Sequence, residues 1–245
     1  MNASELLEEF NLRYNNASEG APGLDTYEIS SYLTIAQEQY VKFNYDASKD
    51  PNTSFELKEK SRRILNELVK DQKINSSISS SKGLLENSVF YELPEDVMYI
   101  VLETATFDGS TPSLKDKMVE VLPITHDEFM LSYKNPFKKP NKNKVWRLDI
   151  SKENSLTTVE IVSAYPLKTY NVRYISNPEP IIVGNLITSS DVAGLGLTIN
   201  GETEVATCLL SELTHREIIN IAVENAVLDY RESTLEGRIK VDSRV

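Results

Sequence analysis

Hydrophobic side chains recur every three or four residues in three stretches near the start of the chain. This spacing places them on one face of an α-helix, as in helices that pack one side against a core. The three stripes are Leu6, Leu7 and Phe10, then Ile29, Tyr32, Leu33, Ala36 and Tyr40, then Leu57, Ser61, Ile64, Leu65 and Leu68. The pattern therefore predicts a helical region over residues 1–73.

Three four-residue patterns predict where helices begin. Residues 25–28 form an acidic capping box, in which Asp25 accepts from a first-turn amide and Glu28 reaches back to the cap. The Thr-first boxes at residues 125–128 and 214–217 repeat the pattern. The last box precedes a stripe at Ile218, Ile219, Ala222, Val223, Ala226, Val227 and Tyr230, which predicts a helix near the C-terminus. Residues 231–245 have mixed charge, and we expect a tail or an arm ordered by a neighbour.

The middle of the chain has short β-branched or aromatic runs bounded by Pro, Asp and Gly. The predicted strands are residues 89–93, 97–104, 118–122, 145–150, 157–164, 169–175 and 181–183. Residues 145–150 alternate between apolar and polar, as in antiparallel sheets with one solvated face. Asn200-Gly201 predicts a hairpin turn. The fold class expected is α+β, with a helical N-terminal part, an antiparallel β-rich middle and a C-terminal helix.

A Ser-rich stretch separates the predicted helices from the predicted strands. Residues 74–83 read INSSISSSKG, a composition typical of a linker or a long loop. We therefore predict two domains, a helical region at 1–73 and a β-rich domain with the C-terminal helix at 84–245.

Composition narrows the classes of protein. The chain has 245 residues, of which 40 % are hydrophobic and 26 % charged, so it can bury a sizeable core. Its net charge of -11 argues against a protein that wraps nucleic acid, which usually presents a basic face. The apolar run at 97–102 is too short to span a bilayer, and the first residues lack the pattern of a secretory signal. We expect synthesis in the cytoplasm and no membrane partner.

Candidate chemistry is sparse. The only cysteine, Cys208, lies in an apolar run typical of a buried thiol, and the only histidines are His126 and His215. Neither histidine has another His or Cys at metal-ligand spacing, and no phosphate-binding loop or hydrolase nucleophile motif is present. Catalysis by carboxylates alone stays open as a third hypothesis. We predict a protein that is not an enzyme, with no catalytic residue, no metal and no cofactor.

One basic cluster contrasts with the acidic remainder of the chain. Residues 134–147 contain six basic residues and no acidic one, with Pro and Asn between them: Lys134, Lys138, Lys139, Lys142, Lys144 and Arg147. Two interpretations stay open. The cluster is a solvated loop that discourages edge pairing, or it contacts an acidic neighbour or a phosphate backbone. We favour the neighbour over the phosphate as the contact, and we take these six residues as candidate assembly contacts.

Short phrases spread from about Glu9 to Glu224 resemble one known family. The phrases are residues 9–10, 13–15, 21–25, 27–30, 33–38, 123–129, 134–137, 140–142, 172–175, 178–182, 215–218 and 221–224. Together they resemble the virion proteins of crAss-like bacteriophages, above all the ring-forming neck and tail proteins that stack below the portal.

The resemblance implies a structural subunit of the virion neck or tail, at the portal vertex, that acts as a head-tail connector. It implies a closed homo-oligomeric ring of about twelve copies, a homododecamer, whose symmetry requires head-to-tail contacts. Expected partners are further copies of the chain and other portal-vertex, ring and tail proteins. The interpretation also allows a transient contact with DNA that passes through the ring. The alternative is an adhesion or receptor-binding module on the virion surface.

Overall fold

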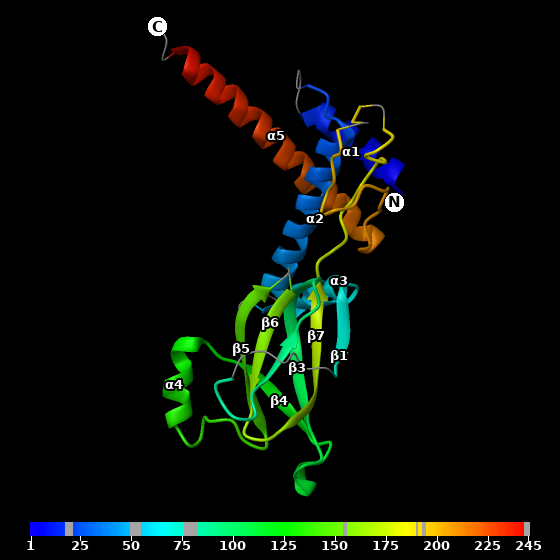
Figure 1. Cartoon of the computed structure of the whole chain (residues 1–245). Helices are drawn as coiled ribbons and strands as arrows, with labels where there is room; N and C mark the ends of the chain where they lie inside the picture. The colour runs from blue at the N-terminus through cyan, green and yellow to red at the C-terminus, as the bar shows by residue number, and fades with distance from the viewer. Residues whose placement is uncertain are drawn as a thin grey trace. The chain divides into compact units, whose positions relative to one another are not determined.

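A computed structural model describes residues 1–17, 22–49, 55–75, 83–153, 156–189, 191–192 and 195–242 (Figure 1). The chain forms two compact units. The helical unit combines Met1–Leu68 with Pro178–Val245, and the strand-rich unit is Val69–Asn177. The stretch at 74–83 that we predicted as a linker falls within the range of the strand-rich unit, and its residues 76–82 lie outside the described residues. Compact units do not test independent folding, so the predicted domains 1–73 and 84–245 stay a prediction.

Within its described residues the helical unit contains four α-helices. They are α1 (Ala3–Ala17), α2 (Thr26–Lys49), α3 (Phe55–Asn66) and α5 (Glu212–Asp242). Helix α5 packs against α1 and α2, and α3 packs against α2. The stripes of the sequence supply the core, with Phe10, Leu33 and Ile219 fully buried. The predicted helical face is thus confirmed for each of these helices whose side chains are described.

Helix starts follow the predicted boxes at α2 but not at α5. Glu28 N donates to Asp25 Oδ1 at 2.8 Å, and Asp25 N donates to Glu28 Oε2 at 3.0 Å, so the acidic capping box is confirmed. Helix α5 begins at Glu212, and the Thr214 hydroxyl donates to Ser211 O at 2.7 Å. The box at Thr214 predicted His215 as the first helical residue, which is wrong by three residues, because Thr214 already lies in the first turn.

The C-terminal helix is also longer than predicted. The hydrophobic stripe ends at Tyr230, but α5 continues through 31 residues to Asp242. Residues 231–242 are therefore helical, while the expected tail or neighbour-ordered arm stays a prediction, and residues 243–245 lie outside the described part of the chain.

An extended segment beginning at Pro178 runs along α2 instead of joining a sheet. The hydroxyl of Ser30 accepts from Val183 N, and that of Thr34 accepts from Ile181 N, both at 3.1 Å. Gln37 Nε2 donates to Glu179 O at 3.0 Å. These side chains thus bind two backbone amides and one carbonyl that a neighbouring strand would otherwise bind. The predicted strand at 181–183 is consequently reduced to one bridge, between Ile182 and Ala206.

The hairpin turn predicted at Asn200-Gly201 is confirmed. Both residues have positive φ, 52° and 87°, and the flanking Ile199 and Glu202 exchange two backbone hydrogen bonds of 3.0 and 2.9 Å. This conformation is typical of a two-residue type I′ turn, which Asn-Gly favours because these residues tolerate the left-handed region.

The strand-rich unit is one seven-stranded sheet. Its strands are β1 (Val69–Ile74), β2 (Val89–Glu92), β3 (Val97–Phe107), β4 (Met118–Pro123), β5 (Lys144–Glu153), β6 (Leu156–Val162) and β7 (Leu167–Ser176). A 3-10 turn (Pro112–Leu114) precedes β4, and α4 (His126–Lys134) lies between β4 and β5. The spatial order is β1-β7-β3-β4-β5-β6-β2. Every pair is antiparallel except β4–β5, which is parallel. The α+β class is confirmed.

Strand β1 corrects the predicted end of the helical region. We assigned residues 69–73 to helices, but Val69–Ile74 pair with β7 from Ile175 to Tyr170. The segment VKDQKI has too few apolar residues to specify a helical face, and it is mostly exposed at the edge of the sheet. Pairing with β7 therefore decides its conformation, which local sequence could not show.

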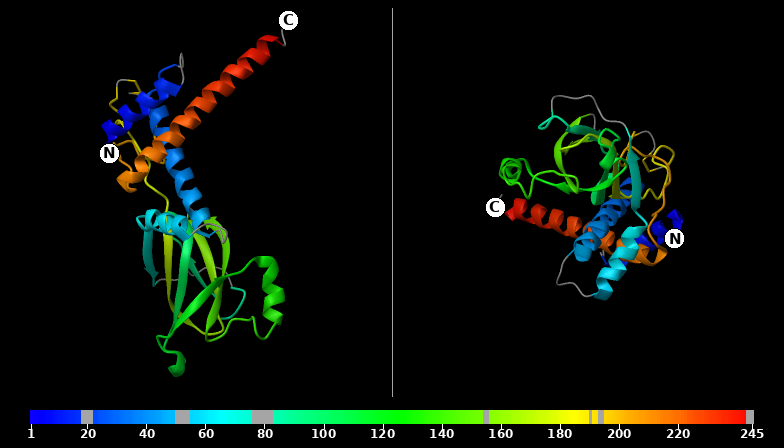
Figure 2. Two further views of the ribbon diagram at one scale, coloured as in Figure 1. Left: turned by 180° about the vertical axis from the view of Figure 1, so that it is seen from behind. Right: turned by 90° about the horizontal axis from the view of Figure 1, so that it is seen from below.

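The sheet curls around its own hydrophobic core, as the view from below shows (Figure 2). Alternate residues of several strands contribute to it, among them Tyr91, Phe107, Val145 and Tyr170. The rings of Tyr91 and Tyr170 lie 5.4 Å apart. At its rim, Gly83 approaches its neighbours so closely that a Cβ would lie 2.4 Å from Ser88 Cβ.

Candidate interaction surface

Helix α4 and the loop that follows it carry the basic cluster. The predicted box begins this helix, since Thr125 Oγ1 accepts from Glu128 N at 3.4 Å. Asp127 and Glu128 lie in the first turn and Lys134 in the last, an arrangement that complements the helix dipole. The charges at the two ends of the segment thus favour a helix with these boundaries.

One face of α4 is anchored on the sheet. Phe129 is buried, with its ring 5.8 Å from Trp146 in an edge-on arrangement and 5.8 Å from Tyr133 in a stacked one. Phe129 and Trp146 belong to a small cluster with Leu148 and Val162, separate from the main core. A nine-residue helix would be marginal alone, so this contact holds it in place.

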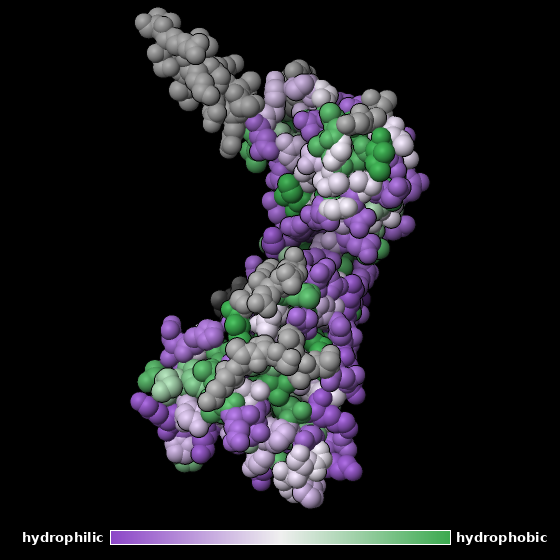
Figure 3. Space-filling model, viewed as in Figure 1, coloured by the Kyte–Doolittle hydropathy of each residue, from purple (hydrophilic) through white to green (hydrophobic). Residues whose placement is uncertain are grey.

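The other face of α4 is hydrophobic and exposed. Leu131 is 75 % exposed and Phe137, in the loop, 88 %, and Met130 is also exposed. Tyr133 stacks on Phe129 but is partly exposed beside them. Figure 3 shows hydrophobic surface beside hydrophilic surface at the position that α4 occupies in Figure 1. Exposed groups of large apolar side chains next to charged ones are typical of protein–protein contact sites.

Hydrogen bonds between residues close in sequence hold the loop at residues 135–143. Asn135 O accepts from the amides of Lys138 and Lys139, each at 3.1 Å, and Asn135 Oδ1 accepts from Phe137 N at 3.0 Å. Asn141 Oδ1 accepts from Asn143 N at 2.8 Å. Such Asn-centred turns give the loop a defined backbone without regular secondary structure.

Four of the six predicted contact residues lie together on this surface. Lys134, Lys138, Lys139 and Lys142 are exposed, and within the described residues no carboxylate forms an ion pair with them. Lys144 is half-buried, and its Nζ donates to Phe137 O at 2.8 Å, so it supports the loop from within. We call α4 and residues 135–143 the lysine surface.

Arg147 is not part of the lysine surface. Its side chain is only 12 % exposed, with Nη1 2.7 Å from Glu103 Oε1 and Nε 2.9 Å from Asp149 Oδ1. Burial works to lower the pKa of the guanidinium, but the Glu103 carboxylate outweighs it and the pKa is raised. Arg147 thus pairs with Glu103 inside the sheet, although its position in the sequence groups it with the surface lysines.

Glu103 has a second partner in the sheet. Its side chain is 4 % exposed and accepts from the Tyr170 hydroxyl. Burial and the neighbouring carboxylate both raise the pKa of Tyr170, so this residue stays a neutral donor. The buried carboxylate therefore has both a cation and a hydroxyl around it, as a buried charge requires.

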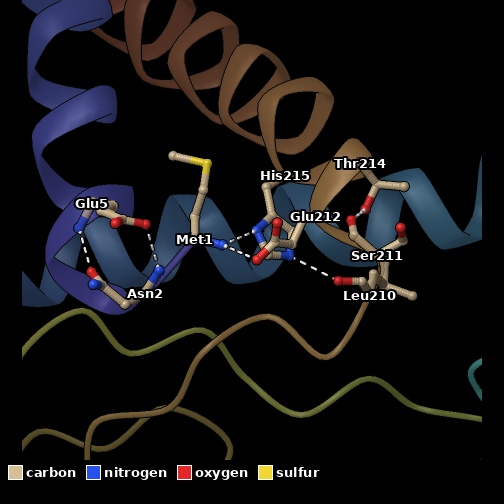
Figure 4. A network of polar contacts seen from close by, with 8 residues as sticks. All are labelled: Met1, Asn2, Glu5, Leu210, Ser211, Glu212, Thr214 and His215. Atoms are coloured by element: carbon tan, nitrogen blue, oxygen red, sulfur yellow. Dashed lines mark hydrogen bonds and ion pairs between the residues drawn. The ribbon is translucent and has the colours of Figure 1, made fainter.

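The two histidines lie in different units. His126 Nε2 is 2.9 Å from Asp149 O in the strand-rich unit. His215 is buried in the helical unit, with Nε2 2.8 Å from Leu210 O. Because a carbonyl can only accept, Nε2 of His215 carries a proton and Nδ1 faces the Met1 amino group at 3.2 Å (Figure 4).

Other candidate chemistry is equally limited. Cys208 is buried, and burial raises the pKa of its thiol to about 11, so it is a poor nucleophile at neutral pH. In the described ranges no three His, Cys, Asp or Glu residues gather where a metal ion would fit. None of the described helices combines the length and apolar character needed to cross a membrane.

A groove lies between α1 and the start of α5 in the helical unit. It has a volume of about 620 Å³, and four glutamates line it, Glu5, Glu8, Glu9 and Glu212. Exposed Leu12 and Leu213 stand in its walls. We call it the acidic groove. Sequence reasoning missed it, because no pattern signals that residues 1–12 and 212–216 meet.

The exposed apolar face of α4 was also missed, although a signal exists. Phe129, Met130 and Leu131 are consecutive, and successive helical residues point about 100° apart. A short helix that buries one of them against a sheet must therefore leave another exposed.

Comparison with known proteins places the chain in a family. Residues 1–237 match the family described as phage tail ring protein 3/4. The chain is 35 % identical over 213 residues to "Ring protein 3" of Bacteroides phage crAss001, covering 86 % of this chain and 88 % of the relative. It is 31 % identical over 248 residues to "Ring protein 4/5" of the same phage, covering 100 % and 99 %. The chain belongs to the phage tail ring protein 3/4 family of crAss-like phages.

Proposed function

We propose that this chain is a structural subunit of the virion neck or tail, forming a closed ring of about twelve copies between portal and tail. The family match over residues 1–237 supports this most strongly, since it includes both compact units. The relatives are ring proteins by name, and the proposed role for this chain is accordingly structural and not enzymatic. It is made in the host cytoplasm and then built into the virion.

In this proposal the ring subunits and the neighbouring ring, tail and portal-vertex proteins are the partners. DNA that passes through the ring makes at most a transient contact. The helical unit has 23 acidic residues against 12 basic ones, and such an excess repels a phosphate backbone.

The test is a cryo-EM reconstruction of the portal vertex in intact virions. We expect density for this fold in a closed ring of about twelve copies between portal and tail. Copies found only at the tip of a fibre would overturn the ring and support the alternative, an adhesion module. One observation favours that alternative, the exposed aromatic pair Tyr133 and Phe137.

The predicted assembly contact is part of the same proposal. Reversing three charges with Lys138→Glu, Lys139→Glu and Lys142→Glu should weaken assembly, most clearly at low salt, where screening is least. Lys73→Glu, Lys115→Glu and Lys168→Glu make the matched control, because they change the charge equally at exposed sites elsewhere in the strand-rich unit. Sedimentation across a salt series measures the effect. Equal behaviour of the two triple variants would contradict the contact.

A further inference from the structure

A closed ring places a geometric demand on its subunit. A contact between identical patches on two copies closes as a dimer, whereas a ring needs two different patches that fit each other head to tail. The proposed function therefore requires a second surface that complements the lysine surface.

The acidic groove has the matching chemistry. Its four glutamates outnumber two cations in the lining, Arg216 and the Met1 amino group, which lies 3.4 Å from Glu212. Glu8 has no ion-pair partner among the residues that the structure describes. The lysine surface presents four unpaired lysines in its turn. Opposite charges on two surfaces steer their encounter and fix their orientation.

Both surfaces also carry exposed apolar side chains. Leu213 in the groove wall is 88 % exposed, and Leu12 accompanies it. Leu131 and Phe137 protrude from the lysine surface. Apolar anchors among charged residues are the usual composition of a protein interface, with the anchors buried and the charges at the rim.

The same features argue against other occupants. A phosphate backbone would use the lysines of one surface but would leave Leu131 and Phe137 without a partner. It would also be repelled by the glutamates of the groove. A second copy of the chain satisfies the charges and the apolar groups on both sides at once.

We propose that the lysine surface of one copy docks into the acidic groove of the next copy, and that this contact closes the ring. The inference rests on the proposed ring function and names the partner surface within it. A head-to-tail contact requires two different patches, and these two surfaces belong to different compact units.

A charge-swap experiment tests the contact. Glu8→Lys with Glu212→Lys should raise the concentration at half-assembly roughly tenfold or more at low salt, and Lys138→Glu with Lys139→Glu should do the same. All four substitutions in one chain restore opposite charges, so assembly should return to within roughly threefold of the parent. Glu202→Lys with Glu204→Lys is the matched control, because both glutamates are exposed in the helical unit outside the groove.

A crosslink gives a second readout. In a Cys208→Ser background, Leu131→Cys and Leu213→Cys should form intermolecular crosslinks with a short bismaleimide, giving a ladder that ends at the ring. Moving the second cysteine to Leu209, exposed but outside the groove, should abolish the ladder.

The outcomes separate the inference from the function beneath it. Suppose the parent forms closed rings in electron micrographs, but the variant with all four substitutions does not regain assembly and no crosslinked ladder appears. The proposed docking is then wrong, and the proposed ring function is unaffected. If the parent forms no ring at any concentration or salt, the proposed function fails and the docking fails with it.

Discussion

The two compact units differ in their net charge and in whether they bury charged side chains. The strand-rich unit has 14 basic and 14 acidic residues, so the whole net charge of -11 lies in the helical unit. Yet the described buried carboxylates, Glu103 and Glu160, both belong to the balanced unit. The described buried polar residues of the acidic unit, such as Ser30, Thr34 and Gln37, carry no formal charge.

This difference shows that regional net charge and interior charge are independent. Exposed like charges are tolerated because water and salt screen them. A buried carboxylate has no such solvent and needs a partner in contact, which Arg147 and Tyr170 supply to Glu103. The helical unit avoids the problem by using neutral donors and acceptors inside.

The largest effect should come from breaking the buried pair. Arg147→Ala leaves Glu103 buried without its cation, and we expect the free energy of unfolding to fall by about 3–5 kcal/mol. Urea denaturation of the full chain, followed by tryptophan fluorescence from Trp146, measures it. Arg173→Ala removes an exposed pair with Asp71 in the same sheet and should change stability by less than about 1 kcal/mol. Equal losses of unfolding free energy in the two variants would contradict the expected difference between buried and exposed ion pairs.

A middle effect should come from the neutral interior of the helical unit. Thr34→Val keeps the shape of the side chain but leaves the Ile181 amide without its acceptor, which should lower the free energy of unfolding by about 1–3 kcal/mol. Thr34→Ser retains the hydroxyl and serves as the control. Hydrogen exchange at the Ile181 amide reports the bond directly. Unchanged protection in the valine variant would show that Thr34 does not hold the Ile181 amide.

The smallest effect concerns an exposed carboxylate of the acidic unit. Hydrogen bonds from the Thr26 hydroxyl and backbone amide lower the pKa of Asp191. A lowered pKa in the folded state gives stability that is present above the unfolded value, about 3.9, and is lost as the pH falls below it. Asp191→Ala should therefore lower the free energy of unfolding at pH 7 by less than about 1 kcal/mol, because water screens an exposed carboxylate. The gap between the parent and the variant should narrow in thermal melts as the pH falls below about 3.9, and a constant gap would refute the assignment.

The sequence predicted the features that depend on near neighbours. The Asp25–Glu28 box, the Asn200-Gly201 turn and the helical stripes follow from residues a few positions apart. Features that depend on distant partners were missed. Val69–Ile74 form a strand because they pair with β7. Residues 181–183 do not form one, because their backbone bonds to side chains of α2.

The candidate site divides in the same way. The exposure of Lys134, Lys138, Lys139 and Lys142 agrees with the charge run, which local sequence displays. The placement of Arg147 does not, because its partner Glu103 is 44 positions away in the chain. Meeting of α1 with α5 in the acidic groove likewise depends on packing that no local pattern encodes.

The single parallel pair of the sheet has a consequence for how this protein can vary. Antiparallel neighbours can be joined by two residues, but β4 and β5 run in the same direction and need a long return path. Residues 124–143 are that path, and α4 with its lysines is built on it. The strands on either side are held by register from Glu120↔Lys144 to Pro123↔Arg147. Because the backbone of this connection lies outside the β4–β5 register, we expect residues 124–143 to tolerate changes in sequence better than the paired strands do.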